Sequence, residues 1–170
     1  MTSRLPVFCL LSVLLCLAGC SHYQLGTTPK LQFSTLYIEP VANKTLLPQA
    51  RTVVSTQLRA AFLHDGRVTL VNSAAEADAT LTVILTDYHR DMTVARENDT
   101  GLARKFSLTL GTTCELRDNR TGQVLFNRRA VSVQRDAFTD SGQLQAEYQV
   151  LPILADALAR KICGTVLDVW

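Results

Sequence analysis

The chain has 170 residues, enough for one domain with its own core and too few for two sizeable domains. Hydrophobic residues make up 47% and charged residues 19%, which is typical of a globular rather than a disordered protein. The formal net charge of +2 argues against a dedicated nucleic-acid-binding domain, because such domains are strongly basic.

An apolar run near the N-terminus ends on a cysteine. Residues 7–17 have the length of a signal-peptide core but are short for a bilayer span, and Arg4 is the sole charge before them. The run ends on Leu17-Ala18-Gly19-Cys20, which resembles the lipobox of bacterial lipoproteins. In such signals the cysteine is lipidated and the preceding peptide is removed. We therefore expect residues 1–19 to be a signal peptide and Cys20 to become the lipidated N-terminus.

A chance match is the alternative, because Cys9 and Cys16 show that cysteine occurs in this segment without a lipobox. The complete four-residue motif in the right position favours lipidation. Several acyl chains anchor a protein stably, so we expect a covalent lipid on Cys20 and no other cofactor. Ser21 rather than Asp follows the cysteine. By resemblance to lipoprotein sorting in proteobacteria, this favours the periplasmic face of the outer membrane.

The mature chain is predicted to form one domain, residues 34–170, after a short tether at residues 20–33. Residues 34–41 are rich in β-branched and aromatic side chains and predict a strand. A helix is predicted at 48–64, with Pro48 at its first position and Gly66 as a left-handed cap. Apolar residues recur on its inner face at helical spacing: Val54, Leu58, Ala61 and Phe62.

Alternating apolar and polar residues predict the rest of a sheet. Four further strands are expected, at residues 67–73, 76–94, 104–118 and 123–136. The turn at 119–122 places Gly122 where a positive φ is needed, so the last two strands should form an antiparallel hairpin. The alternation changes parity near residues 127–129, which predicts a β-bulge there.

The C-terminal segment predicts a long amphipathic helix. Six residues recur at spacings of three and four: Leu144, Tyr148, Leu151, Ala155, Leu158 and Ile162. Pro152 should kink this helix or begin its main part. The predicted order is β-α-β-β-β-β-α. Two amphipathic helices and a mostly antiparallel sheet with one apolar face indicate an α+β two-layer domain, with the helices on one side.

Catalytic and metal-binding motifs are not found in the sequence. It contains no Gly-x-Ser-x-Gly, no His-Glu-x-x-His and no phosphate-binding glycine-rich loop, and the three histidines are scattered. We therefore expect no catalytic residues and no metal site. Cys114 and Cys163 could pair in an oxidising envelope, but two buried thiols behaving as small hydrophobes are the favoured alternative.

Basic residues concentrate in the predicted strands. Nine lie between residues 88 and 136: Arg90, Arg96, Arg104, Lys105, Arg117, Arg120, Arg128, Arg129 and Arg135. Such side chains could pair with the phosphates of a membrane glycolipid. A solvated face whose charges block strand-on-strand aggregation is at least as good an explanation for any single residue. The pairs Arg104-Lys105 and Arg128-Arg129 could meet across the hairpin, although the sequence leaves the register open.

Five segments of the mature chain occur in a familiar order: "HYQLG", "LYIEPVANKTLLPQ", "EADATLTVILTDYHRD", "RKFSLTLGTTCELRDNRTGQVLFNR" and "LPILADALARKICGTVLDVW". In these segments and their order, the chain resembles the LptE family of lipopolysaccharide-assembly lipoproteins. Together they span nearly all of residues 20–170.

This resemblance implies a non-enzymatic outer-membrane lipoprotein with two helices on an antiparallel sheet. Such a protein plugs the LptD β-barrel, assists its assembly and binds lipopolysaccharide on its way to the cell surface. The candidate lipopolysaccharide-binding residues are Arg90, Arg104, Lys105, Arg128 and Arg129. No nucleic-acid partner is expected.

Two alternatives come from other functional classes. The chain could be a lipoprotein auxiliary subunit of an envelope ABC-type lipid transport system, since such proteins share the lipobox, the β-α-β start and the long last helix. An inner-membrane transporter partner would favour this alternative. An envelope hydrolase with a cryptic site rests on little more than the presence of Ser, His and Asp.

Overall fold

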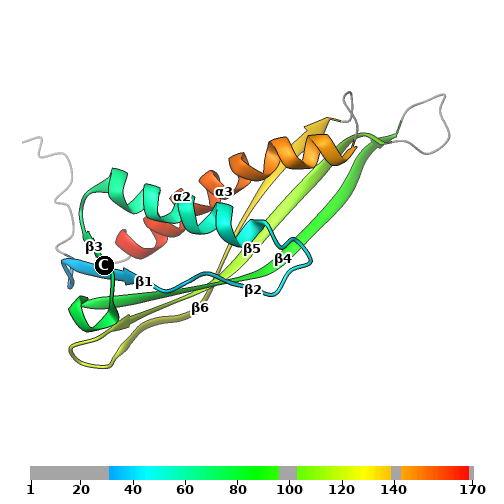
Figure 1. Ribbon diagram of the computed structural model, residues 1–170. Helices are drawn as coiled ribbons and strands as arrows, with labels where there is room; N and C mark the ends of the chain where they lie inside the picture. Colours follow the sequence, from blue (N-terminus) through cyan, green and yellow to red (C-terminus); the bar gives the residue numbers. More distant parts are fainter. Residues whose placement is uncertain (1–30, 96–102, 139–142, 169–170) are drawn as a thin grey trace, which may run out of the picture. The chain divides into compact units, whose positions relative to one another are not determined.

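A computed structural model of the protein describes residues 31–95, 103–138 and 143–168 (Figure 1). The predicted signal peptide, Cys20 and most of the tether lie outside the described residues, so their assignment stays a prediction. The described residues form a layer of two helices against one sheet. This confirms the predicted α+β class and the order β-α-β-β-β-β-α.

The sheet combines parallel and antiparallel pairing. Its strands are β1 (Thr35–Ile38), β2 (Ala42–Asn43), β3 (Thr69–Val71), β4 (Ala79–Ala95), β5 (Ala103–Asp118) and β6 (Val124–Phe138). They lie in the order β3-β1-β4-β5-β6, and β2 pairs with β4. β1 runs parallel to β3 and β4, whereas β4, β5 and β6 are antiparallel. The parallel pair β1–β3 is possible because a helix connects the two strands.

That helix, α2 (Ala50–Asp65), begins two residues later than predicted. Pro48 therefore precedes the helix instead of opening it. The turn before α2 is held by Asn43, whose side-chain amide donates to the carbonyl oxygen of Leu47 at 2.9 Å. Gly66 ends the helix as predicted: its φ is 73°, and its N–H donates to the carbonyl oxygen of Phe62 at 3.2 Å.

In Figure 1, both helices lie along the same face of the sheet. Their apolar sides and that face of the sheet form a single core. The second helix, α3 (Gln143–Leu167), continues through Pro152, so the alternative that Pro152 begins its main part is wrong. Buried side chains include Val54, Leu58 and Phe62 from α2, Leu151, Leu154, Leu158 and Ile162 from α3, and Leu81, Val83, Leu85, Phe106, Leu108 and Leu110 from the sheet.

The predicted stripe on α3 is correct in its C-terminal part and wrong at Tyr148, which is 58% exposed. The side chain of Leu144 lies outside the described residues. The buried surface of α3 is wider than one stripe and also includes Leu154, Ala159 and Val166. This helix packs against both α2 and the sheet, so side chains around more of its circumference are covered.

Bulges in β6 and β4 determine which face of the sheet the neighbouring side chains occupy. Three steps along β6, from Phe126 to Arg129, oppose two steps along β5, from Leu116 to Cys114, and Arg128 has a φ of 48°. This confirms the bulge predicted at 127–129. A second bulge in β4 was not predicted: Leu85 pairs with Thr112, but Asp87 pairs with the adjacent Gly111. Beyond this bulge, the side chains of Tyr88 and Arg90 face α3.

Candidate functional site

The bulge in β4 brings Arg90 to the helix-covered face, where Glu147 of α3 binds it. The guanidinium forms an ion pair with the Glu147 carboxylate and lies 5.7 Å from the ring centroid of Phe106. Tyr88 donates to the same carboxylate at 3.2 Å, and burial together with Glu147 raises the pKa of Tyr88 to about 12. Arg90 therefore helps to join α3 to β4, and its charge is balanced within the protein.

Lys105 lies near the beginning of β5, and its ammonium group is 2.8 Å from the Asp136 carboxylate of β6. The backbone of Arg104 belongs to β5, but its side chain lies outside the described residues. Lys105 pairs with Phe138, whereas Arg129 pairs with Cys114. Nine residues of strand, about 30 Å, separate the two positions. The suggested meeting of Arg104-Lys105 with Arg128-Arg129 is therefore wrong.

The two arginines at the β6 bulge have different surroundings. The Arg129 guanidinium lies 4.5 Å from the ring centroid of Phe126 and donates to the carbonyl oxygen of Thr165 at 3.5 Å. Arg128 is exposed and has no partner among the described residues. Because a bulge turns two consecutive side chains in different directions, the pair does not act as one basic cluster.

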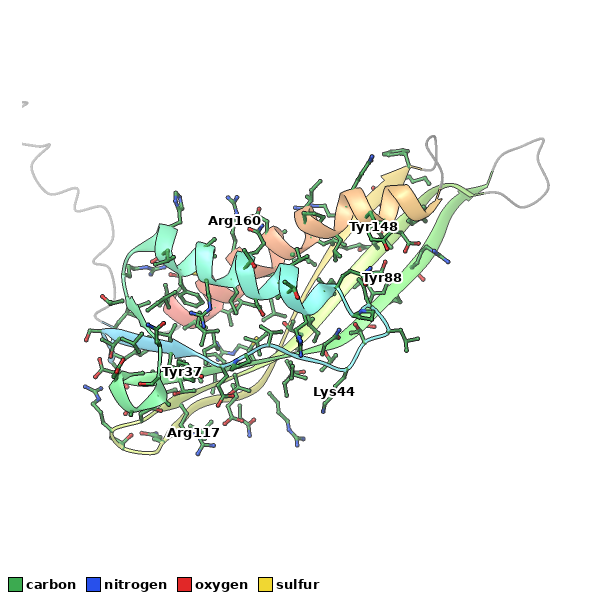
Figure 2. The ribbon with its side chains drawn as sticks, in the orientation of Figure 1. Tyr37, Lys44, Tyr88, Arg117, Tyr148 and Arg160 are labelled. Atoms are coloured by element: carbon green, nitrogen blue, oxygen red, sulfur yellow. The ribbon has the colours of Figure 1, made fainter. Side chains whose placement is uncertain are left out.

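On the face of the sheet away from the helices, Asp87, His89 and Asp91 follow one another at alternate positions of β4. His89 Nδ1 lies 3.0 Å from Asp87 Oδ2, and Nε2 lies 3.3 Å from Asp91 Oδ2. The hydrogen bond with Asp87 raises the pKa of His89. In Figure 2, Arg117 lies on this side, whereas Tyr88 and Tyr148 lie together beside the first turns of α3. This face combines both signs of charge.

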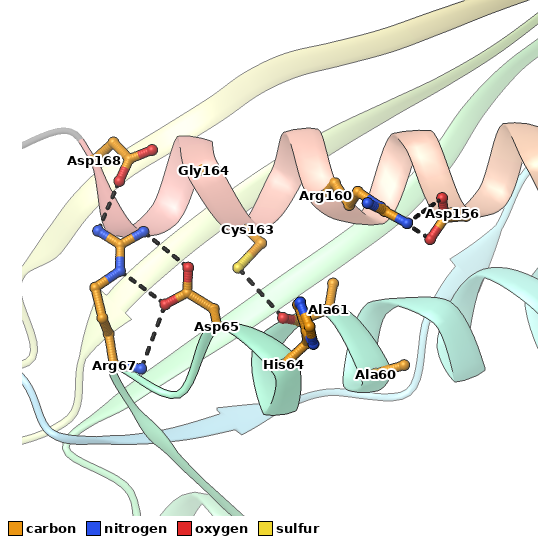
Figure 3. Close-up of a pocket in the computed structure, with 10 residues that line it drawn as sticks. All are labelled: Ala60, Ala61, His64, Asp65, Arg67, Asp156, Arg160, Cys163, Gly164 and Asp168. Atoms are coloured by element: carbon orange, nitrogen blue, oxygen red, sulfur yellow. Dashed lines mark hydrogen bonds and ion pairs between the residues drawn. The ribbon is translucent and has the colours of Figure 1, made fainter.

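A groove of about 590 Å³ lies between the C-terminal halves of α2 and α3 (Figure 3). Arg67 bridges its end: Nε is 2.7 Å from Asp65 Oδ1, and Nη1 is 2.7 Å from Asp168 Oδ1. Hydrogen bonds to Asp65 and Asp168 raise the pKa of Arg67, so its charge is permanent. Arg160 pairs with Asp156 at 3.0 Å. Each arginine in this groove thus has an acidic partner.

Both described cysteines are free and buried, as the favoured alternative predicted. Cys163 lines the groove between the helices, and its thiol lies 3.9 Å from the carbonyl oxygen of Ala61. Burial raises the pKa of Cys163 to about 12 and that of Cys114 to about 11. Neither thiol has the low pKa of a reactive nucleophile.

Other classes of site are not found in the described ranges. Within residues 31–95, 103–138 and 143–168, no three or more His, Cys, Asp and Glu side chains are placed to hold a metal ion. In those same ranges, neither helix combines the length and the apolar composition needed to cross a membrane. The sequence reasoning missed the Asp65–Arg67–Asp168 bridge, since Asp168 lies about a hundred residues away from Arg67.

Comparison with known proteins identifies the family. The family model described as "LptE: Lipopolysaccharide-assembly" matches residues 33–163, well over half of the chain. A search of curated proteins finds no match.

Solved structures share the fold at low sequence identity. A minor lipoprotein from Acinetobacter baumannii has a TM-score of 0.54 at 20% identity, covering 81% of this chain and 95% of that one. An uncharacterized lipoprotein B from Nitrosomonas europaea has a TM-score of 0.54 at 17% identity, covering 84% of each chain. A protein from Xanthomonas campestris has a TM-score of 0.61 at 13% identity, covering 84% and 87%. At these identities the likeness establishes the fold alone.

Proposed function

Because the chain belongs to the LptE family of lipopolysaccharide-assembly proteins, we propose that it is an outer-membrane lipoprotein of the lipopolysaccharide exporter. In this role it binds lipopolysaccharide, plugs the LptD β-barrel and assists assembly of that barrel. The role is one of binding and assembly, without catalysis. The acylated Cys20 would hold the domain at the periplasmic face of the membrane.

The family match carries this proposal, because it runs from before β1 into the last turns of α3 and so includes every described strand, all of α2 and most of α3. The lipobox-like motif at Cys20 supports the anchor and the location. The fold is shared with two lipoproteins, which is compatible with the proposed anchor and location.

Among the four candidate lipopolysaccharide-binding residues whose side chains are described, the contacts favour Arg128. Arg90 and Lys105 already have carboxylate partners, and Arg129 is held against Phe126 and α3. Arg128 projects its charge into solvent. A glycolipid phosphate could bind to it without breaking an internal ion pair, which would otherwise offset the gain.

Affinity purification of the tagged, full-length protein from detergent-solubilised outer membranes tests the proposal. We expect a large β-barrel to co-purify in near-stoichiometric amount and to be identified by mass spectrometry as LptD. An untagged strain processed in parallel controls for barrels that adhere to the resin. Recovery of the protein alone would contradict the proposal, and recovery with an inner-membrane transporter would favour the auxiliary-subunit alternative.

A further inference from the structure

A second groove lies between the solvent-facing side of α2 and the segment that follows β1. It has a volume of about 430 Å³. The segment Pro40–Val41 forms one wall, and the other is formed by Arg51, Thr52, Ser55, Thr56 and Arg59. These helix residues lie away from the core, which is contacted by Val54, Leu58 and Phe62 of the same helix.

Helix geometry places the two arginines at either end of this groove. Arg51, Ser55 and Arg59 are four residues apart, so they follow one stripe along α2. The rise per residue separates Arg51 from Arg59 by about 12 Å along the helix axis. Two arginine side chains can therefore approach one ligand from opposite ends, with Ser55 between them.

The charge in this groove is not balanced, unlike that in the groove between the helices. None of the described residues that line it is acidic. Arg59 donates only to the carbonyl oxygen of Ile38, at 3.5 Å, and Arg51 has no hydrogen-bond or ion-pair partner among the described residues. By contrast, Arg67 and Arg160 in the other groove each have an aspartate partner.

Hydroxyl groups add further donors between the arginines. Thr56 donates to the carbonyl oxygen of Thr52 at 3.0 Å, whereas the hydroxyls of Thr52 and Ser55 have no partner in the described part of the chain. The two guanidinium groups and the hydroxyls of Thr52 and Ser55 form a donor-rich site with a net positive charge. An anion with several oxygens matches such a site, and guanidinium groups bind phosphate through two parallel hydrogen bonds.

We propose that this groove binds a phosphate group, and that its source is a phosphate of the lipopolysaccharide headgroup. The second part rests on the proposed function. The apolar wall at Pro40–Val41 leaves room for a larger molecule that carries the phosphate. Recognition of the glycolipid would thus include α2 and not only the strands.

Calorimetric titration of the full-length protein in detergent micelles tests this site. Inorganic phosphate and lipid A are titrated separately at constant ionic strength, because screening by salt alters exposed charges. The test variant is Arg51→Gln/Arg59→Gln. The matched control is Arg117→Gln/Arg160→Gln, which removes the same charge from two exposed arginines that have acidic partners. Melting temperatures establish that both variants are folded.

We expect Arg51→Gln/Arg59→Gln to weaken binding of lipid A about ten-fold or more and the control to change it less than two-fold. Arg51→Lys/Arg59→Lys should fall between, since lysine keeps the charge but loses the planar fork. If Arg51→Gln/Arg59→Gln weakens the binding of inorganic phosphate but leaves the binding of lipid A unchanged, the phosphate site is supported and its assignment to lipopolysaccharide is overturned. Equal behaviour of test and control variants would overturn the site.

The proposed function can fail separately. Co-purification of a barrel with the wild-type protein tests the exporter role and does not involve the groove. The wild-type protein could bind phosphate through Arg51 and Arg59 and yet recover no barrel. In that case the phosphate site stands, and its assignment to lipopolysaccharide falls with the exporter role.

Discussion

One carboxylate oxygen of Asp78 accepts hydrogen bonds from both the backbone N–H and the hydroxyl of Ser34, each at 2.8 Å, although the residues are 44 positions apart. The same oxygen accepts the backbone N–H of Thr35 at 3.0 Å. Asp78 thus fixes the start of β1 beside the start of β4. The hydrogen bonds from Ser34 and Thr35 hold the pKa of Asp78 far below its usual range.

Asp78→Ala should lower the free energy of unfolding by about 2 kcal/mol or more, because hydrogen bonds to a charged acceptor contribute about 1.5–3 kcal/mol. Denaturant unfolding at pH 7 measures this change. The matched control is Asp156→Ala, which removes an exposed ion pair within α3 and should cost less than about 1 kcal/mol. Equal losses would mean that the Asp78 contacts do not order β1.

The lowered pKa of Asp78 also predicts a dependence of stability on pH. Its contribution is fully present above the unfolded-state pKa of about 3.9 and is lost as the pH falls towards the lower folded-state pKa. The free energy of unfolding should therefore decrease below about pH 4, and this decrease should be smaller in Asp78→Asn. Thermal unfolding across pH 2 to 6 compares the two proteins; parallel curves would contradict the assignment.

Leu158 of α3 is completely buried and should be essential for docking of the helices. Leu158→Ala should cost about 2–5 kcal/mol through lost burial and an unfilled cavity. Leu158→Asp, which buries an unpaired charge, should cost more. Ile153→Ala on the same helix is the control, because Ile153 is 54% exposed. An unchanged melting temperature in Leu158→Asp would mean that α3 does not pack on the sheet.

Arg128 adopts a left-handed backbone conformation, with a φ of 48°, at the β6 bulge. Glycine tolerates this conformation without the steric cost of about 1–2 kcal/mol that a side chain incurs. Arg128→Gly should therefore leave the free energy of unfolding unchanged or raise it by about 1 kcal/mol. Arg135→Gly, in regular strand, should destabilise it. Unfolding in urea distinguishes them, and destabilisation of both alike would contradict the bulge.

The two buried thiols should resist alkylation. Burial raises the pKa of Cys114 to about 11 and of Cys163 to about 12, so little thiolate forms at pH 8. We expect iodoacetamide to label neither residue in the folded protein and both in denaturant, as mapped by mass spectrometry of peptides. Leu63→Cys, at a 68% exposed position, supplies the positive control. Rapid labelling of native Cys163 would show that the groove opens to the thiol.

Cys20→Ala should abolish lipid attachment, because the thiol that receives the acyl-bearing group is lost. Metabolic labelling with palmitate and fractionation of membranes measure the effect. Cys16→Ala, in the same segment, should be labelled like the wild type. Recovery of Cys20→Ala in the outer membrane at the mature mass would contradict the predicted anchor.

Local patterns determined much of this fold. Alternation along residues 104–118 and 123–136 predicted the β5–β6 hairpin and the bulge at 127–129, because side chains in a strand alternate between two faces. The positions of Gly66 after a predicted helix and Gly122 in a predicted turn indicated a positive φ at each, and the φ angles of 73° and 72° confirm this. The β4 bulge also left a signal, since apolar positions change from odd residues such as Leu85 to the even residue Tyr88.

The tertiary structure alone decided which charges are available. The sequence shows where the basic residues are but not which of them form ion pairs. Only the register of β4 against β5 and the docking of α3 bring Glu147 to Arg90, and only the crossing of α2 over the β1 end places Arg59 near Ile38. Ion pairing depends on distances between residues far apart in the chain, whereas strand and helix patterns depend on near neighbours. The fold class and the predicted anchor therefore follow from the sequence, and the candidate phosphate groove follows only from the structure.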